Sequence, residues 1–279
     1  MFDTTPIECP SAGAFGFTSL LDGRESWDEA ALRAFFPDDS GPLREAVEAS
    51  GERGLSYQVL LARGPGGASL VDSGNGWVDP ARPGALAQAL AERGVEPSDI
   101  DRIAITHFHS DHVGGLVGSS GEAAFPRAEL HSSQAEWDFW TAYCGRREAE
   151  PWRRALQDAI DKGYRGRIFL HGSEAEIAPG IRLRPAPGHT RGHAIVEFGG
   201  SGGERLLHSG DLFHLSAQFR FPDRRTQYDQ DPAGARESRL GLAREAAESG
   251  CLVFLNHAAF PGFGHVRAEG EAFRWDPLG

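Results

Sequence analysis

Ile103-Ala-Ile-Thr-His107-Phe-His109-Ser-Asp111-His112-Val-Gly-Gly115 is the most informative stretch of this sequence. An alternating apolar run through Ile103 predicts a strand, and the strand runs directly into three histidines and an aspartate. Burying four such side chains without a cation would be costly. Imidazole and carboxylate together suit zinc, iron, nickel or cobalt better than calcium or magnesium. The stretch therefore predicts a metal site at the end of a strand.

The spacing of these ligands predicts two metal positions. His107 and His109 lie two residues apart, so in extended backbone both side chains project to one side and can bind one ion. Asp111 and His112 are adjacent, and a short turn can direct this pair toward a second position. The following Gly-Gly pair is expected to let the backbone turn sharply.

Composition narrows the choice of partners. The chain of 279 residues has a formal net charge of -12, which argues against nucleic acid or an anionic membrane as the main partner. A small-molecule substrate is expected instead. Residues 1–8 lack a basic region followed by an apolar core, so we expect no signal peptide and a cytoplasmic protein. Cys9, Cys144 and Cys251 are far apart and are expected to be reduced thiols.

The pattern along the chain predicts strands alternating with helices. We expect a single domain over residues 1–279, with sheets inside and helices outside. A helical insertion at about 24–56 would be a cap, a partner surface or a plain connector. Strands are expected at 13–21, 57–63, 68–72, 100–105, 128–131, 167–170, 181–185, 193–198, 204–209 and 251–255, with a hairpin turn at 199–203, and helices at 83–93, 133–143, 152–161 and 232–249.

Three later predicted strands also end at a possible metal ligand. His189 stands at a glycine turn after one strand, Asp211 ends another, and His257 ends a third. Each alone is weak, because a lone histidine or aspartate at a strand end is usually a hydrogen-bonded turn residue. Together with the first cluster they supply seven ligands.

With these residues in order, the sequence resembles the metallo-β-lactamase superfamily over roughly residues 55–265. The early turn Val71-Asp-Ser-Gly74 resembles the family's turn that supports the ligands. The resemblance implies an α/β fold, the αββα four-layer sandwich of two mixed sheets flanked by helices. It also implies two divalent ions, zinc first and manganese, cobalt, iron or nickel as alternatives. One ion would take His107, His109 and His189, the other would take Asp111, His112 and His257, and Asp211 would bridge both.

Two local stretches indicate a branch of the family. Residues 256–266, and 210–214 followed by 229–232, resemble the branch of methyl parathion hydrolase and the quorum-quenching lactonases. The diiron flavoproteins resemble the pattern but have glutamate where His109 stands. The small acyl-homoserine lactonases have tyrosine where His214 stands, which leaves the substrate open.

The resemblance therefore predicts a dinuclear metal hydrolase. It would open lactones, or cleave esters with a hydrophobic group, through a metal-bridging hydroxide. The alternatives are a phosphotriesterase and a persulfide dioxygenase. The dioxygenase would use a single iron held by His107, His189 and Asp211.

Other roles are assigned by position in the sequence. Asp111 and Asp211 would act in catalysis through the metals, and His214 and His265 would protonate a leaving group or orient the substrate, or make structural hydrogen bonds. An apolar pocket would be lined by aromatic side chains, for which core packing is the alternative: Trp137, Trp140, Phe219, Phe260 and Phe263.

The remaining histidines are expected to support the ligands or the fold, and the insertion is a candidate dimer surface. His193 and His208 would hold ligands in place, and His131 and His171 would be structural. Aromatic residues in the insertion look exposed in the sequence, so a homodimer through residues 24–56 is a further expectation.

Overall fold

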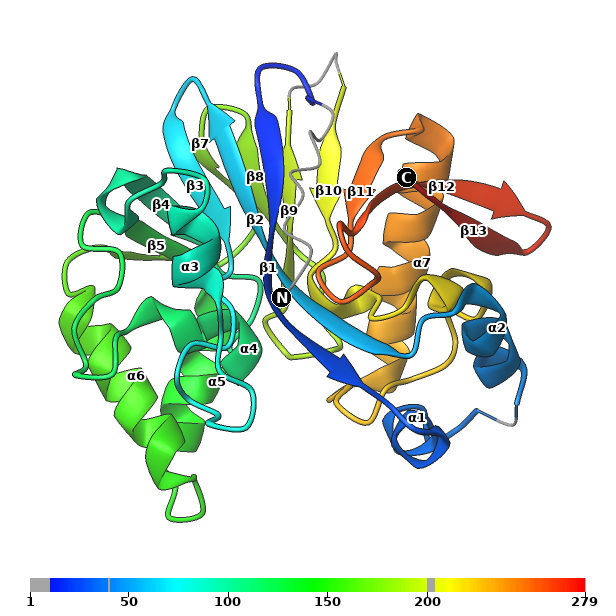
Figure 1. Ribbon diagram of the computed structural model, residues 1–279, viewed down its shortest axis with the longest axis horizontal. Coiled ribbons are helices and arrows are strands. Elements are labelled where there is room, and N and C mark those ends of the chain that lie inside the picture. Colours follow the sequence, from blue (N-terminus) through cyan, green and yellow to red (C-terminus); the bar gives the residue numbers. More distant parts are fainter. Residues whose placement is uncertain (1–10, 40, 200–203, 279) are drawn as a thin grey trace.

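The computed structural model describes residues 11–39, 41–199 and 204–278. Two mixed β-sheets pack face to face, and helices cover the outer face of each (Figure 1). The predicted αββα sandwich is confirmed. Figure 1 shows α3 to α6 on the side of the first sheet and α7 on the side of the second.

The first sheet follows the order of the chain. Its first three strands pair antiparallel, and its last three add in parallel. Its strands are β1 (Gly16–Ser26), β2 (Gly54–Gly64), β3 (Gly67–Val71), β4 (Ile100–Ala104), β5 (Glu129–Ser133) and β6 (Ile168–His171).

The second sheet runs in the order β13-β12-β11-β10-β9-β8-β7. Its pairs are antiparallel except for the parallel pair of β10 and β11. Its strands are β7 (Ala175–Ala178), β8 (Ile181–Pro185), β9 (Ala194–Phe198), β10 (Leu206–His208), β11 (Leu252–Phe254), β12 (Phe263–Glu269) and β13 (Ala272–Pro277).

The helices differ widely in length, from the single turn of α4 to the 18 residues of α7. The α-helices are α1 (Glu29–Phe35), α2 (Pro42–Ser50), α3 (Leu86–Ala91), α4 (Ser110–Val113), α5 (Gln134–Cys144), α6 (Pro151–Gly163) and α7 (Pro232–Ser249). The 3₁₀ turns are η1 (Pro97–Asp99), η2 (Gly114–Leu116), η3 (Gly210–Leu212) and η4 (Ser216–Arg220). Among the described residues, no helix combines the length and the apolar character that crossing a bilayer requires.

Alternation along the strands builds the layers. Successive side chains of a strand point to opposite faces, so Leu60 packs between the sheets while Leu61 packs under the helices of the first layer. In the second sheet, Leu206 faces the first sheet and Leu207 faces α7. Each fully buried side chain of this size contributes about 1.5–3 kcal/mol. Both faces are therefore held, and the loops at the strand ends rest on a rigid frame.

Residues between β1 and β2 form α1 and α2. The side chain of Asp28 caps α1 by accepting a hydrogen bond from the backbone of Ala31, at 2.8 Å. Phe35 and Phe36 are buried and pack with Leu43 of α2 against the body of the protein. The aromatic residues that suggested a homodimer surface therefore face inward, and a dimer through this region stays a prediction.

Three strands were not predicted from the sequence: β7, β12 and β13. Their exposed faces are polar, so they lack a continuous apolar run. Residues 200–203 of the predicted hairpin turn lie outside the described residues, as do Cys9 and the N-terminal residues 1–8. Cys144 and Cys251 are free thiols.

Gly114 and Gly115 have a role other than the predicted sharp turn. Gly114 has ordinary helical backbone angles and ends α4. A Cβ atom on Gly114 would collide with the carbonyl oxygen of Asn75, and one on Gly115 with that of Ser73. Their small size lets residues 73–75 pass close behind the ligand-bearing segment.

Candidate metal centre

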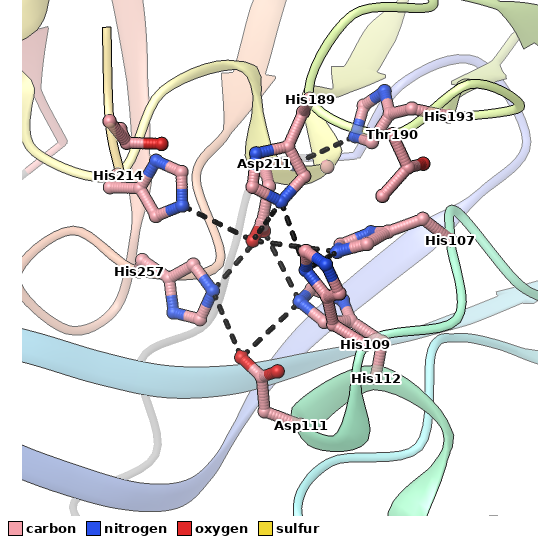
Figure 2. Close-up of polar contacts among 12 residues, drawn as sticks. His107, His109, Asp111, His112, His189, Thr190, His193, Asp211, His214 and His257 are labelled. Carbon is pink, nitrogen blue, oxygen red and sulfur yellow. Dashed lines mark hydrogen bonds and ion pairs between the residues drawn. The ribbon is translucent and has the colours of Figure 1, made fainter. Parts of the chain in front are cut away.

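The seven predicted ligands converge at one edge of the sandwich, where several strands end (Figure 2). The segment after β4 carries four of them, the loop between β8 and β9 carries His189, η3 after β10 carries Asp211, and the segment after β11 carries His257. Because these strands point the same way, ligands far apart in the sequence meet at a single edge.

The first group joins three imidazoles and a carboxylate. His109 Nδ1 lies 3.0 Å from His107 Nε2 and 3.1 Å from His189 Nε2. Asp211 Oδ2 lies 3.6 Å from His107 Nε2 and 3.4 Å from His189 Nε2. One set of ligand atoms thus comes from the segment after β4 and from the loop between β8 and β9.

The second group uses the other oxygen of the same aspartate. Asp211 Oδ1 lies 3.2 Å from His112 Nε2 and 3.1 Å from His257 Nε2. Asp111 Oδ2 lies 3.4 Å from each of these two nitrogens. Asp211 is therefore shared between the two groups, as the resemblance implies.

The arrangement fits a pair of metal ions. A tetrahedral ion with bonds of about 2.1 Å needs its ligand atoms about 3.4 Å apart, which matches the separations in both groups. His112 Nε2 is buried and has no hydrogen-bond partner among the described residues, although it lies beside two carboxylates. A buried ring nitrogen left in this way is accounted for by coordination. The chemistry of the donors, imidazole and carboxylate, suits zinc and its neighbours.

Each of four ligand imidazoles is fixed by a contact on its far side. The Nδ1 atom of His107 lies 3.0 Å from Thr106 Oγ1, and that of His257 lies 3.0 Å from the carbonyl oxygen of Ser56. The Nδ1 atoms of His112 and His189 face carboxylates. Such contacts hold the proton on Nδ1, which leaves the lone pair of Nε2 free for a metal.

Asp72 supports His112 and the segment before it. Its Oδ2 atom lies 2.7 Å from His112 Nδ1 and accepts a hydrogen bond from Thr106 Oγ1 at 2.8 Å, and its Oδ1 accepts from the backbone of Thr106. Asp72 has a left-handed backbone (φ 63°), which is uncommon for a residue with a side chain. The strain is the cost of turning this carboxylate toward the ligands.

The charges favour the metal-binding forms of His107, His109 and Asp211, whereas they favour the protonated form of His112, whose proton a metal ion would replace. Burial lowers the pKa of His107 and His109 well below the usual value, and neighbouring imidazoles lower it further. Burial opposes ionisation of Asp211, but His257 and His112 outweigh it and hold the pKa of this carboxyl well below its usual range. For His112, burial opposes the charge and the carboxylates of Asp211 and Asp111 raise the pKa. Neutral imidazoles and ionised carboxylates are the forms that bind metals.

Arg239 is a buried cation that the sequence analysis missed. Its Nη2 atom donates to Asp229 Oδ2 at 2.6 Å, and its Nε donates to the carbonyl oxygen of Leu212, next to the shared aspartate, at 2.6 Å. The other carboxylate oxygen of Asp229 lies 3.2 Å from Nδ1 of His189. Arg239 therefore braces two metal ligands at once. The sequence signal that could have indicated its burial is its position on α7, on the same helix face as the apolar residues Ala235 and Leu242.

Glu136 is a second buried charge that was missed. Its Oε1 accepts from the backbone of Phe108 at 2.9 Å, and its Oε2 accepts from Thr190 Oγ1 at 2.7 Å and from the backbone of Gly192 at 3.0 Å. One carboxylate on α5 thus ties together the two loops that carry ligands of the first group. Its position early in α5, among Trp137 and its neighbours, gave no sign of this role.

The ligands open into a cavity of about 610 Å³. His109, Asp111, Asp211, His214 and His257 lie on its wall. The rest of the wall combines polar and charged side chains with aromatic ones. The aromatic side chains come from the insertion, from β2, from α5 and from the loop before α7: Trp27, Phe35, Tyr57, Phe139, Trp140, Tyr143 and Tyr228.

Of the five aromatic residues predicted to bind substrate, Trp140 lines this cavity. Trp137 packs against Phe108 in the core under the helices of the first sheet. Phe219 and Phe263 are buried in the cores on either face of the second sheet. Phe260 lines a neighbouring cavity. Their aromatic character did not distinguish packing from binding, because the packing of each helix, turn or strand decides which side its ring faces.

Of the two histidines predicted to act on the substrate, His214 lies beside the ligands and His265 does not. His214 Nε2 lies 3.2 Å from Asp211 Oδ2, and its ring stacks on that of His257. Burial lowers the pKa of His214 to about 4. His265 lies on β12, which runs back antiparallel to β11, and its Nδ1 contacts the carbonyl oxygen of Cys251 at 3.1 Å. That is the end of β11 away from the ligands, which removes the basis for a catalytic role of His265.

The remaining histidines lie where the sequence analysis expected. His193 Nε2 accepts a hydrogen bond from the backbone of Asp211 at 2.9 Å. His208 Nδ1 accepts one from the backbone of Gly210 at 3.0 Å, so both support the shared aspartate. His131 and His171 face each other across β5 and β6, at 3.2 Å, as part of the sheet.

Comparison with known proteins identifies a family. Residues 52–249 match the model described as the metallo-beta-lactamase superfamily. A probable metallo-hydrolase of Mycobacterium tuberculosis is 32% identical over 197 residues, which are 60% of this chain and 61% of that protein. The chain thus spans about three fifths of the length of the curated relatives that it matches at this identity.

Two solved structures share the fold over nearly the whole chain. One is AidC, described as a dizinc quorum-quenching lactonase, with a TM-score of 0.86, 24% identity and coverage of 99% of both chains. The other is the hydrolase AbOPH, with a TM-score of 0.83, 26% identity and coverage of 98% of this chain and 97% of that one.

We predict that Asp229→Asn weakens metal binding by about 10- to 100-fold, because the substitution removes the charge that both His189 and Arg239 face. Since His189 belongs to the first group alone, one of the two ions should be lost first. Zinc titration against a competing chelator measures this.

The matched control for this prediction is Asp138→Asn, at an exposed position on α5. Equal zinc affinities in the Asp229 variant and in this control would contradict the role given to Asp229.

Proposed function

The chain belongs to the metallo-beta-lactamase superfamily, and we propose that it is a hydrolase that opens lactones, or cleaves other carboxylic esters, with a hydrophobic acyl group. The observation that carries the proposal is the shared carboxylate of Asp211, which joins two ligand groups on the wall of an aromatic cavity. AidC, which shares the fold, is described as a complex with the product N-hexanoyl-L-homoserine, an opened lactone.

The ligand groups define what the bound metals contribute. Two divalent ions held by His107, His109 and His189 and by Asp111, His112 and His257 would make water acidic enough to attack near neutral pH and would polarise a substrate carbonyl. The protein holds the ligands rigid and keeps their surroundings buried, so these charges act in a poorly screened environment.

The cavity wall is suited to an acyl group. Phe35 packs edge-on against Tyr228 and at a tilt against Trp27, so the insertion and the loop before α7 form one continuous aromatic surface. Tyr228 is about half exposed, with an exposed fraction of 51%, and lies at the mouth. Burying an alkyl chain against these rings supplies binding energy without demanding one shape.

Arg153 is a charged residue of the same wall. Its guanidinium lies between Trp140 and Trp152, at 4.2 and 4.6 Å from the ring centroids. One of its nitrogens donates to the carbonyl oxygen of Phe108, at 3.2 Å. The stacking fixes the plane of the guanidinium, so its remaining N–H groups can orient a carbonyl or the carboxylate of the product.

His214 is the candidate for contact with the reacting ester. Its ring is held between the parallel ring of His257, at 5.3 Å, and the edge of Phe35, at 5.0 Å. Nδ1 of His214 is buried without a hydrogen-bond partner among the described residues. The other nitrogen, Nε2, faces the shared aspartate on the cavity wall, and its N–H can donate a hydrogen bond to a substrate oxygen there.

The proposed activity predicts acid release from lactones that depends on metal. In a pH-stat, turnover should rise with acyl length, vanish after chelation and return on reconstitution with zinc, manganese or cobalt. Asp211→Ala should remove metal and turnover together while circular dichroism stays unchanged. Turnover near the wild-type value in this variant would refute the mechanism, and silence toward every lactone with metal bound would refute the substrate class.

The role of His214 predicts a loss of rate without a loss of metal. His214→Phe keeps a flat ring between His257 and Phe35 but removes the donor, so kcat should fall by about 100-fold or more while zinc content stays at the wild-type level. The same substitution at His265 serves as the control, and its kcat should be unchanged. A His214 variant with wild-type kcat would exclude direct contact with the reaction.

The cytoplasmic location and the homodimer remain proposals. The location rests on the sequence pattern described above, whereas Phe35 and Phe36, which the dimer would expose, are buried. Light scattering measures the oligomeric state.

A further inference from the structure

A second cavity of about 600 Å³ adjoins the first. It lies between the end of β1, the loop of residues 75–85 and the outer face of α3. Phe260, which the sequence predicted to bind substrate, lies on its wall rather than in the metal cavity. The two cavities share three lining residues: Tyr57, Asn75 and Arg82.

The shared residues form a partition held by polar contacts. Tyr57 donates its hydroxyl proton to Glu25 Oε2 at 2.6 Å, and Arg82 Nη1 donates to the same carboxylate oxygen at 2.8 Å. Arg82 Nη1 also lies 3.0 Å from the oxygen of Tyr57. A second carboxylate, Asp79, accepts from Nε of Arg82 at 3.0 Å. The partition is therefore a polar cluster between two cavities that both have apolar side chains on their walls.

One half of the partition is fixed and the other can move. Tyr57 is buried and packs against the ring of His257. The side chain of Arg82 is 47% exposed and stands on a loop, and its partners Glu25 and Asp79 are about one third exposed. Ion pairs at this exposure contribute little to stability, so Arg82 can swing outward at small cost.

The wall of the second cavity is suited to an alkyl chain. Its apolar residues come from all three elements and from the turn after β11: Leu21, Ala81, Pro83, Ala85, Ala89 and Phe260. Charged side chains also lie on this wall: Asp22 and Arg24 of β1, Arg82 of the partition, and Glu92 and Arg93 just after α3. An alkyl chain entering from the metal cavity would cover this half-exposed apolar surface. Because the two cavities adjoin, the expected ligand is the chain of an ester bound at the metal centre.

We propose that the second cavity binds the far end of long acyl chains, and that Arg82 moves aside to admit them. The inference rests on the proposed function, because the acyl chain is that of the ester held at the metal centre. Short acyl groups would fill the aromatic cavity alone, and long ones would extend past Tyr57 toward Phe260. Substrate length would thus be set by a cavity that does not contact the metals.

The test fills the second cavity from a position that is exposed. Gln88 lies on α3, lines this cavity and is exposed, so Gln88→Trp places a large ring there without entering the core. Ala87→Trp is the matched control, because the neighbouring residue of a helix points about 100° away and Ala87 is also exposed. The substrates are γ-lactones with side chains from ethyl to dodecyl, hydrolysed by the metal-loaded protein.

In the wild-type protein, kcat/KM should keep rising to the longest side chains, by up to about fourfold for each methylene group that is buried. In Gln88→Trp the rise should stop earlier, so that the ratio of kcat/KM for dodecyl to butyl substrates falls by about tenfold or more. Ala87→Trp should keep the wild-type ratio. Calorimetric titration with dodecanoate and with butyrate should rank the three proteins in the same order without relying on turnover.

The failures of the two proposals are distinguishable. If short lactones are hydrolysed with metal but Gln88→Trp leaves the ratio unchanged, or Ala87→Trp lowers it equally, the second cavity does not hold the chain and the proposed function stands. If no ester of any length is hydrolysed with metal bound, the proposed function is wrong and this inference is wrong with it.

Discussion

The carboxylate of Asp211 is the point on which the site depends. One of its oxygens faces the imidazoles of His107 and His189, and the other faces those of His112 and His257. A single short side chain can do this only if the end of β10 is held between the end of β4 and the end of β11. The sandwich supplies that condition, because both faces of each sheet are packed and the strand ends cannot slide. The fold thus determines the metal centre, because the packed core fixes the positions of the strand ends and the strand ends fix the positions of the ligands.

Buried charges outside the ligand set complete the arrangement. Asp72, Glu136 and the pair of Asp229 and Arg239 each touch ligands or the backbone next to them. Burying such groups is expensive unless every polar atom finds a partner, and an unpaired member would cost more than the pair contributes. These residues therefore commit the loops to one geometry. That rigidity is what a pair of closely spaced metal ions requires, since their mutual repulsion must be opposed by ligands that do not move.

The sequence was most informative where chemistry and periodicity coincide. The run through Ile103 into His107 and His109 marked both a strand and a ligand pair, and the structure brings the later ligands His189 and His257 to the same edge. Aromatic side chains were poorly predicted, because a ring serves equally well in a core and in a pocket: Phe219 and Phe263 are core, while Trp27 and Phe35 line the cavity. Roles that depend on strand direction were also lost. His265 follows His257 closely in the sequence, but β12 carries it back to the far end of β11.

The central claim is that both ligand groups act together, and metal titration of the metal-free protein tests it most directly. Zinc or manganese would be added stepwise while lactone hydrolysis is followed in a pH-stat and bound metal is counted. The account predicts little turnover with one ion per chain and full turnover when the second ion binds. Full activity with a single ion would contradict it. A single iron accompanied by oxygen consumption with a persulfide would assign the same ligands to a different reaction.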